Sequence, residues 1–181
     1  MTSSKDPFAT PREHRDPARR LRGRLAAPVT LWTAGSDEGR AGLTVSSLVV
    51  AEGDTASVLG LINPLSELAD ALVATKRFVV HVLHWEHRRI AERFAGAFPS
   101  PGGRFSEEAW RQTGWGPVLS TAAHLTFCRY ETTQEVGYHS LVMGTVESIE
   151  LGDALDPLVY LQGRFRRLEQ PGGRSPSGGV A

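Results

Sequence analysis

The sequence predicts a mainly β domain, a small barrel with short helices at its periphery. Stretches rich in β-branched and aromatic residues, separated by Gly, Pro and Asn turns, recur from residue 28 to residue 168. The helical patterns between them are short, as expected for helices that cover a sheet rather than form the core. The chain has 181 residues and 40% of them are hydrophobic, which suits a single core.

Composition and charge exclude several functional classes. The 20 Lys and Arg residues balance the 20 Asp and Glu residues, so the formal net charge is zero, which argues against a general binder of nucleic acid or anionic membranes. A single cysteine, Cys128, allows no internal disulfide framework and fits a reducing compartment. The apolar runs are too short for a membrane span, and the polar N-terminus lacks the apolar core of a signal peptide. We therefore expect a soluble, cytoplasmic protein.

Both ends of the chain are expected to be flexible tails. Residues 1–17 are polar and contain three prolines, and residues 170–181 are rich in Gly, Pro and Ser. Neither segment can bury much apolar surface. One domain is therefore predicted over residues 18–169.

The elements of this domain follow from periodicity and from turn residues. Strand 77–83 is continuously apolar and should be central, and helix 66–74 presents one apolar face. The Gly- and Pro-rich segment 96–116 is expected to be a long loop with one helical turn at 106–111, and to act as a lid or aromatic wall. The remaining predicted elements are helices at 18–25 and 86–95, and strands at 29–33, 42–50, 56–62, 122–135, 138–151 and 158–168.

Three short segments carry candidate binding residues. Thr44, Ser46 and Ser47 place three hydroxyls on one strand, where hydroxyls and free backbone N–H groups hold a phosphate. Asn63 and Ser66 lie between a strand and a helix, a position suited to an anion or to simple capping. His139 enters a strand after a glycine and is either a ligand contact or a structural histidine. From the residues alone, the structural alternative stays open for each.

Other chemistry is not supported by the sequence. His81, His84 and His87 are spaced by three, but a strand-to-helix boundary is predicted between them, so we expect no metal site. Cys128 has no catalytic motif around it and is expected to be a small buried residue. The common nucleotide-binding and hydrolase motifs, G-x-G-x-x-G, the Walker loop and G-x-S-x-G, do not occur in their required contexts.

Five segments, in order, resemble the flavin reductase-like family, the FMN-binding split barrel, whose members include the small reductase components of two-component flavin monooxygenases. The resemblance covers about residues 21–168. The segments are GLTVSSLVV at 42–50, LGLINPLSELADALVATKRFVVHVL at 59–83, a helix ending in R-F-A-G at 84–96, GYHSLVMGTVESI at 137–149 and PLVYLQGRFRRL at 157–168.

The resemblance implies a homodimeric, six-stranded split β-barrel that binds flavin close to the subunit interface. It implies that His139 lies near the nicotinamide and the flavin ring, as the catalytic residue. The cofactor-binding residues carried over from the family are Thr44, Val45, Ser46 and Ser47 along the flavin, Asn63 and Ser66 by its phosphate or ribityl chain, and Arg93 and Phe94 at the pocket border.

The implied activity is NAD(P)H-dependent reduction of FMN, with FAD also used in the family, to supply a partner monooxygenase. Hydride passes from nicotinamide C4 to flavin N5, so the protein needs positioning and electrostatics rather than an acid–base dyad. The chain departs from the family pattern at Tyr138, His81 and Pro64–Leu65. The alternatives are an FMN-binding electron carrier with little NAD(P)H turnover, and a barrel that has exchanged flavin for another ligand.

Overall fold

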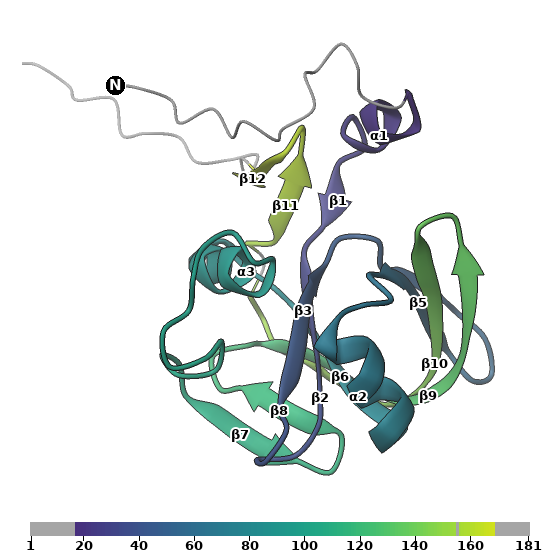
Figure 1. Ribbon diagram of the computed structural model, residues 1–181, viewed down its shortest axis with the longest axis vertical. Helices are drawn as coiled ribbons and strands as arrows, with labels where there is room; N and C mark the ends of the chain where they lie inside the picture. The colour runs from purple at the N-terminus through teal and green to yellow at the C-terminus, as the bar shows by residue number, and fades with distance from the viewer. Residues whose placement is uncertain (1–16, 155, 169–181) are drawn as a thin grey trace, which may run out of the picture.

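The main sheet has seven strands in the order β3-β2-β6-β9-β10-β5-β4, all paired antiparallel (Figure 1). The structure, a computed structural model, describes residues 17–154 and 156–168. The predicted tails at 1–17 and 170–181 lie, apart from Pro17, outside the described residues. The strands are β2 (Thr30–Ala34), β3 (Ala41–Val45), β4 (Val49–Ala51), β5 (Ser57–Ile62), β6 (Arg77–Val82), β9 (His124–Val136) and β10 (His139–Leu151).

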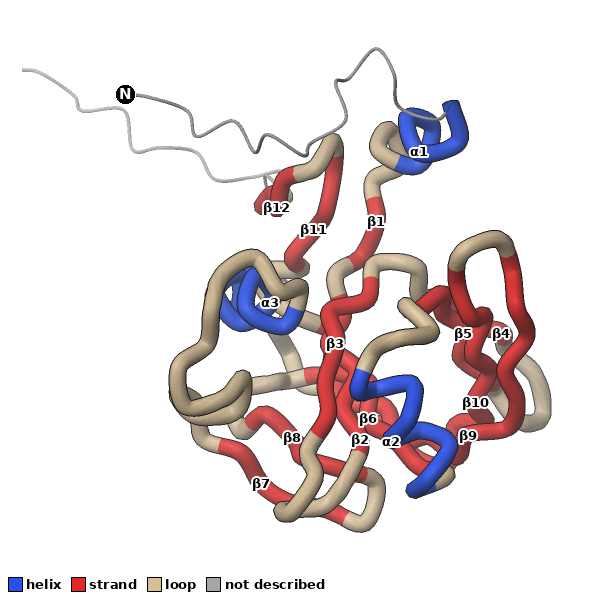
Figure 2. Tube along the Cα trace, in the orientation of Figure 1, coloured by secondary structure: helices blue, strands red, loops and turns tan. Residues whose placement is uncertain are grey.

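The two edge strands are halves of one predicted strand. β3 and β4 both come from the segment 42–50, which is interrupted at residues 46–48. One bent strand therefore supplies both edges of the sheet, and Figure 2 shows the sheet curling round between them. With β3 and β4 taken as one, six strands surround the core and the ring stays open between β3 and β5. The predicted mainly β, six-stranded split barrel is confirmed.

The burial of β2 and β6 in the core explains their central position in the sheet. β2 is buried along its whole length, and Phe78, Val79 and Val80 of β6 are also buried, as the continuous apolar run predicted. Trp32 stacks on Phe78 with ring centroids 5.0 Å apart. Gly60 on β5 lies against the Trp32 ring, because a Cβ there would come within 2.7 Å of it.

Two helices pack on the barrel as expected from their apolar faces. α2 (Glu67–Thr75) begins at Ser66, whose Oγ accepts from the Ala69 N–H at 3.3 Å. It lies across the middle of the barrel in Figure 1 and buries Leu68 and Leu72. The predicted helix 86–95 is a 3₁₀ turn, η2 (Trp85–His87), followed by α3 (Arg88–Phe94).

A small three-stranded sheet forms an arm that projects from the barrel beside the N-terminal helix α1 (Pro17–Arg22) (Figure 1). The prediction of a single strand at 158–168 is wrong. Gln162 and Gly163 both have positive φ, 53° and 78°, and the chain turns back there to form a hairpin. The Gln162 N–H donates to the Gly23 carbonyl at 2.8 Å and ties the two parts together. The arm strands are β1 (Ala27–Pro28), β11 (Leu158–Leu161) and β12 (Arg164–Arg167), in the order β1-β11-β12.

The helical turn predicted at 106–111 is also wrong. β7 (Trp110–Thr113) pairs with β8 (Gly116–Leu119) as a hairpin. The Trp110 ring packs at 4.8 Å from Phe105 and 5.8 Å from Phe94, and these contacts override the local helical composition. The predicted helix 18–25 likewise ends early, at Arg22, where Gly23 follows.

Two buried groups in the core are held in their uncharged forms. The His81 Nδ1–H donates to the Leu31 carbonyl at 2.9 Å, and Nε2 accepts from the Leu119 N–H at 3.1 Å, so this histidine links β6 to β2 and β8. Its burial lowers the pKa from 6.5 to about 4. Burial raises the pKa of the Cys128 thiol to about 12. Among the described residues no helix has the length and apolar character needed to cross a bilayer.

We predict that Gly60→Ala destabilises the fold by about 1–3 kcal/mol, because the new methyl group overpacks the Trp32 ring. Gly39→Ala is the control, since a Cβ there meets no atom within 4 Å. Urea unfolding of both variants measures the difference. Equal stability of the two variants would show that the close approach of β5 to Trp32 is not a constraint.

We predict that the neutral state of His81 makes the protein less stable as pH falls from 6.5 to 4. In this range the unfolded chain binds a proton at residue 81 that the folded chain does not, so the free energy of unfolding falls, by on the order of 3 kcal/mol in total. His84 and His87, whose pKa values burial also lowers, act in the same direction.

The measurement is urea unfolding across this pH range for the wild type and for His81→Asn. Contributions from the other titrating groups cancel in the difference, so the variant should show the shallower pH dependence. Parallel curves would contradict a neutral, buried His81.

Candidate functional site

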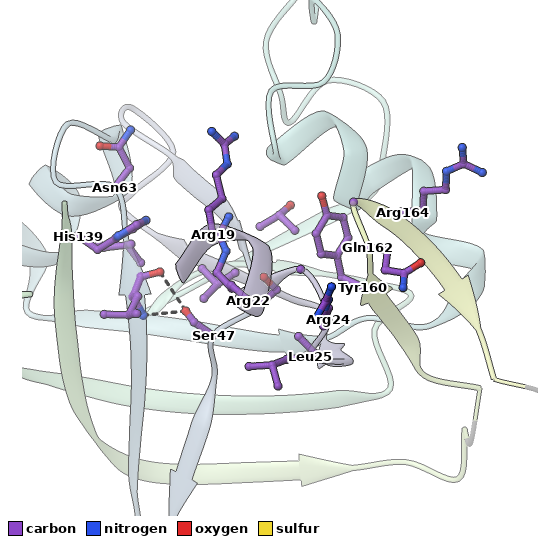
Figure 3. Close-up of a pocket in the computed structure, with 18 of the residues that line it drawn as sticks. Arg19, Arg22, Arg24, Leu25, Ser47, Asn63, His139, Tyr160, Gln162 and Arg164 are labelled. Atoms are coloured by element: carbon purple, nitrogen blue, oxygen red, sulfur yellow. Dashed lines mark hydrogen bonds between the residues drawn. The ribbon is translucent and has the colours of Figure 1, made fainter. Parts of the chain in front are cut away.

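A cavity of two lobes lies where the barrel fails to close. A first lobe of about 1200 Å³ is lined by the end of β3, residues 46–47, the end of β5, the start of β10 and the arm (Figure 3). A second lobe of about 680 Å³ extends toward α3. The two lobes share a wall made by Arg22, Thr44, Ser46, Tyr160, Gly163 and Arg164.

Six of the nine predicted site residues line the first lobe, and three do not. Ser66 caps α2, and Phe94 packs against Phe105 with centroids 4.9 Å apart. Arg93 is 1% exposed and forms ion pairs with both Glu107 and Glu108. The six that line the lobe are Thr44, Val45, Ser46, Ser47, Asn63 and His139.

Ser47 bridges the split in the barrel. Its Oγ accepts from the Leu61 N–H at 2.8 Å and donates to the Leu61 carbonyl at 3.0 Å (Figure 3). The side chain thus satisfies the two backbone groups on β5 that a neighbouring strand would otherwise satisfy. The edge of β5 beside the cavity is held in place without a backbone ladder.

The hydroxyls of Thr44 and Ser46 differ in whether they are already hydrogen-bonded. The Thr44 Oγ1 donates to the Ala91 carbonyl at 2.7 Å, which fixes β3 to α3. Ser46 is exposed and has no hydrogen-bond partner within the described chain. Because residues 46–48 lie between β3 and β4, outside the strand pairings, the hydroxyl and local backbone amides there suit an oxyanion.

Asn63 and His139 face the same lobe from the opposite side of the split (Figure 3). The Asn63 Oδ1 accepts from the Leu65 N–H at 2.9 Å, which orients the amide at the end of β5. His139 is half-buried and begins β10, and the pairing of Ser140 with Ile62 places it beside the end of β5. These polar groups come together although they are 76 positions apart in the sequence.

The cavity mouth carries a strong positive charge that sequence reasoning missed. Neither the arginines of α1 nor those of β12 were among the candidate site residues. The two groups lie about 140 positions apart, so only the hairpin turn at Gln162 reveals that they converge. The arginines that line the first lobe are Arg19, Arg20, Arg22, Arg24, Arg164 and Arg166, and no Asp or Glu of the described chain lines it.

The loop predicted as a lid lies elsewhere. From segment 96–116 only Ala97 lines the cavity, in the second lobe. Trp110 belongs to the core behind α3, and Trp115 packs on Phe127 with centroids 5.3 Å apart. The ion pairs of Arg93 fix the middle of the segment to α3.

The histidines at 84 and 87 come closer together than the sequence indicated. Ligand atoms of His84, Glu86 and His87 lie within 4.8 Å of one another. However, His87 Nδ1 accepts from the His84 backbone N–H at 3.1 Å, so in the neutral ring Nε2 carries the proton and donates to Thr121 Oγ1. A metal ion needs a lone pair at that nitrogen, so we derive no metal chemistry from this cluster.

We predict that Ser47→Ala lowers the free energy of unfolding by about 1 kcal/mol, because two backbone groups of Leu61 lose their partner. Ser46→Ala, which removes an adjacent hydroxyl without a partner in the described chain, should leave stability unchanged within about 0.5 kcal/mol. Thermal or urea unfolding distinguishes the two. A larger loss for Ser46→Ala than for Ser47→Ala would contradict the bridge.

Comparison with known proteins agrees with this geometry. The family model described as "Flavin reductase like domain" matches residues 22–169. The reductase component of 4-hydroxyphenylacetate 3-monooxygenase from Pseudomonas aeruginosa is 33% identical over 149 residues, covering 81% of this chain and 88% of that protein. An FMN reductase (NADH) from Ancylobacter novellus is 30% identical over 164 residues, covering 90% of this chain and 88% of that protein.

A solved structure shows the same fold. The NADH:FAD oxidoreductase of Streptomyces globisporus C-1027 superposes with a TM-score of 0.77 at 25% identity, covering 89% of this chain and all of that one. The match to the family model extends from the end of α1 to just beyond β12, so it includes the barrel, the arm and all of the cavity lining except Arg19 and Arg20. The chain belongs to the flavin reductase-like family.

Proposed function

We propose that this chain is an NAD(P)H-dependent flavin reductase that transfers hydride from a reduced nicotinamide to FMN or FAD. The observation that carries the proposal is the cavity of two lobes with a shared wall. Its volume exceeds the roughly 300–1000 Å³ of a typical single-ligand pocket, which leaves room for two substrates side by side.

The residues present fit a flavin. Thr44, Val45 and Ser47 form a wall whose polar groups are already engaged, suited to the flat face of a ring. The free Ser46 hydroxyl and the Asn63 amide are placed to bind the ribityl chain or phosphate. Ser66 and Phe94 contribute indirectly, since Ser66 starts the helix behind Asn63 and Phe94 packs against Gly42 at the start of β3.

The protein's part in the reaction is positioning. The bound flavin supplies the hydride-accepting chemistry. His139, half-buried at the lobe wall, orients the ring system of the donor and donates a hydrogen bond from its imidazole. Among the described residues that line the first lobe there is no carboxylate, which fits a role in positioning.

Several features of the biological context follow from the same proposal. The mouth of the first lobe is open, which favours release of reduced flavin to a separate monooxygenase. Among relatives, the Pseudomonas aeruginosa protein is named as such a reductase component. We further propose a homodimer, with flavin close to the subunit interface, and a cytoplasmic location.

We predict that purified protein oxidises NADH or NADPH only when flavin is supplied, under anaerobic conditions, and that His139→Ala lowers kcat/KM at least about tenfold because the donor ring loses its orienting contact. Tyr138→Phe is the matched control, since this neighbouring side chain is 92% exposed. Flavin bleaching measured by visible absorption reports the rate. A yellow protein that does not bleach would instead indicate an electron carrier.

A further inference from the structure

The rim of the first lobe gathers arginines from two separate parts of the chain, and all of them are exposed although the formal net charge of the chain is zero (Figure 3). A backbone hydrogen bond of 2.8 Å from the Gln162 N–H to the Gly23 carbonyl holds the two parts together. Arg22 and Arg164 each lie within two residues of this bond. The arginine rim consists of Arg19, Arg20, Arg22 and Arg24 from the N-terminal segment and Arg164 and Arg166 from β12.

The arginine rim is not neutralised by the part of the chain that the structure describes. None of its members forms an ion pair there, whereas Arg167 on the same strand pairs with Asp156 at 2.8 Å. Among the described residues, the only carboxylate that lines either lobe belongs to Glu92, which is bonded to Arg88 at 3.0 Å. Like charges around one space repel, and a bound anion relieves that repulsion. Guanidinium groups match phosphate through paired hydrogen bonds, which makes phosphate the best-suited anion.

The wall that carries Ser46 indicates which phosphate meets the rim. The hydroxyls of Thr44 and Ser47 already donate to backbone carbonyls, at 2.7 and 3.0 Å, so they offer a flat ring a wall without free donors. Ser46 is exposed, its hydroxyl is unbonded within the described chain, and it lines both lobes together with Arg22 and Arg164. A phosphate loses less hydration at an exposed rim than against a buried wall. This arrangement favours a flavin whose ring lies against Thr44 and Ser47 and whose phosphate lies at the rim.

We propose that Arg22 and Arg164, together with Ser46, bind the phosphate of the flavin, so that this reductase selects FMN and FAD over riboflavin. The inference rests on the proposed function and names the class of flavin that the site accepts. A phosphate monoester such as that of FMN carries about −1.5 to −2 charges at pH 7, whereas riboflavin carries no phosphate. The other four arginines of the rim add long-range attraction for the anionic flavin.

The test measures the Kd of riboflavin and of FMN by quenching of flavin fluorescence, without turnover, in flavin-free wild type and in Arg22→Gln/Arg164→Gln. The matched control is Arg89→Gln, which alters an exposed arginine that lines neither lobe. We expect the wild type and the control to bind FMN at least about tenfold more tightly than riboflavin. The double variant should lose about tenfold or more in affinity for FMN, while its affinity for riboflavin changes by less than about threefold. Unchanged riboflavin binding also shows that the variant is folded.

Ionic strength provides a second readout of the same contact. Added salt screens the attraction between exposed charges, so it should weaken binding of FMN to the wild type and leave binding of riboflavin unchanged. The slope for FMN should be smaller in the double variant. Equal salt dependence for the two flavins would contradict a phosphate contact at the rim.

The pyrophosphate of the hydride donor is the other phosphate that enters this cavity under the proposed function. Calorimetry with NADH therefore accompanies the flavin measurements, and the double variant should bind NADH within about threefold of the wild type. A loss of affinity for NADH that equals or exceeds the loss for FMN would overturn the inference, because the arginines would then serve the donor.

The remaining outcomes distinguish the inference from the proposed function. Equal affinity of the wild type for riboflavin and FMN, with NADH-dependent reduction of both, would overturn the inference and leave the reductase function intact. A preference for FMN that the double variant loses, in a protein that neither NADH nor NADPH reduces, would support the phosphate site and overturn the proposed function. If neither flavin binds, both are overturned.

Discussion

The fold depends on one strand that must supply both edges of the same sheet. A backbone that bends this sharply cannot keep its ladder, so pairing stops at Val45 and resumes at Val49. Ser47 compensates with a side chain that both donates to and accepts from Leu61. The same break leaves a gap between β3 and β5, and the cavity occupies that gap. The split in the barrel and the formation of the site are therefore consequences of one local geometry.

The barrel side and the arm side of the cavity differ in how far their residues are buried. The barrel wall rests on buried groups: Trp32 on Phe78, His81 between two neighbouring strands, and Thr44 bonded to α3. The arm has exposed arginines and short strands, and backbone hydrogen bonds join it to the rest of the chain at Leu158, which bonds to Val29 and Leu83, and at Gln162, which bonds to Gly23. A rigid wall suits ring alignment, and an exposed arm suits a surface that admits substrates and releases products.

Sequence patterns predicted the features that depend on burial and capping within a short stretch of chain. The apolar run of β6 was identified correctly, and capping of α2 by Ser66 was one of the two roles left open for that residue, because burial and capping leave direct marks on composition. The hairpin containing Trp110 was missed because its stability comes from Phe94 and Phe105, which are distant in sequence or ambiguous in pattern. The residues alone indicated three candidate binding segments but left a structural role open for each, and only the resemblance to a family favoured a flavin site there. The arginine convergence was invisible, since it depends on the turn at Gln162 and on tertiary packing.

Cys128 is the one cysteine of the sequence, and it lies fully buried with a pKa raised to about 12. Its thiolate is therefore scarce at neutral pH and shielded from reagents. The surface of the folded protein therefore offers no reactive cysteine of its own to a labelling reagent. A new cysteine at an exposed position of the arm would react alone, and a pair, one on each side of the cavity mouth, would carry fluorophores or spin labels that report the separation of the arm from the barrel directly.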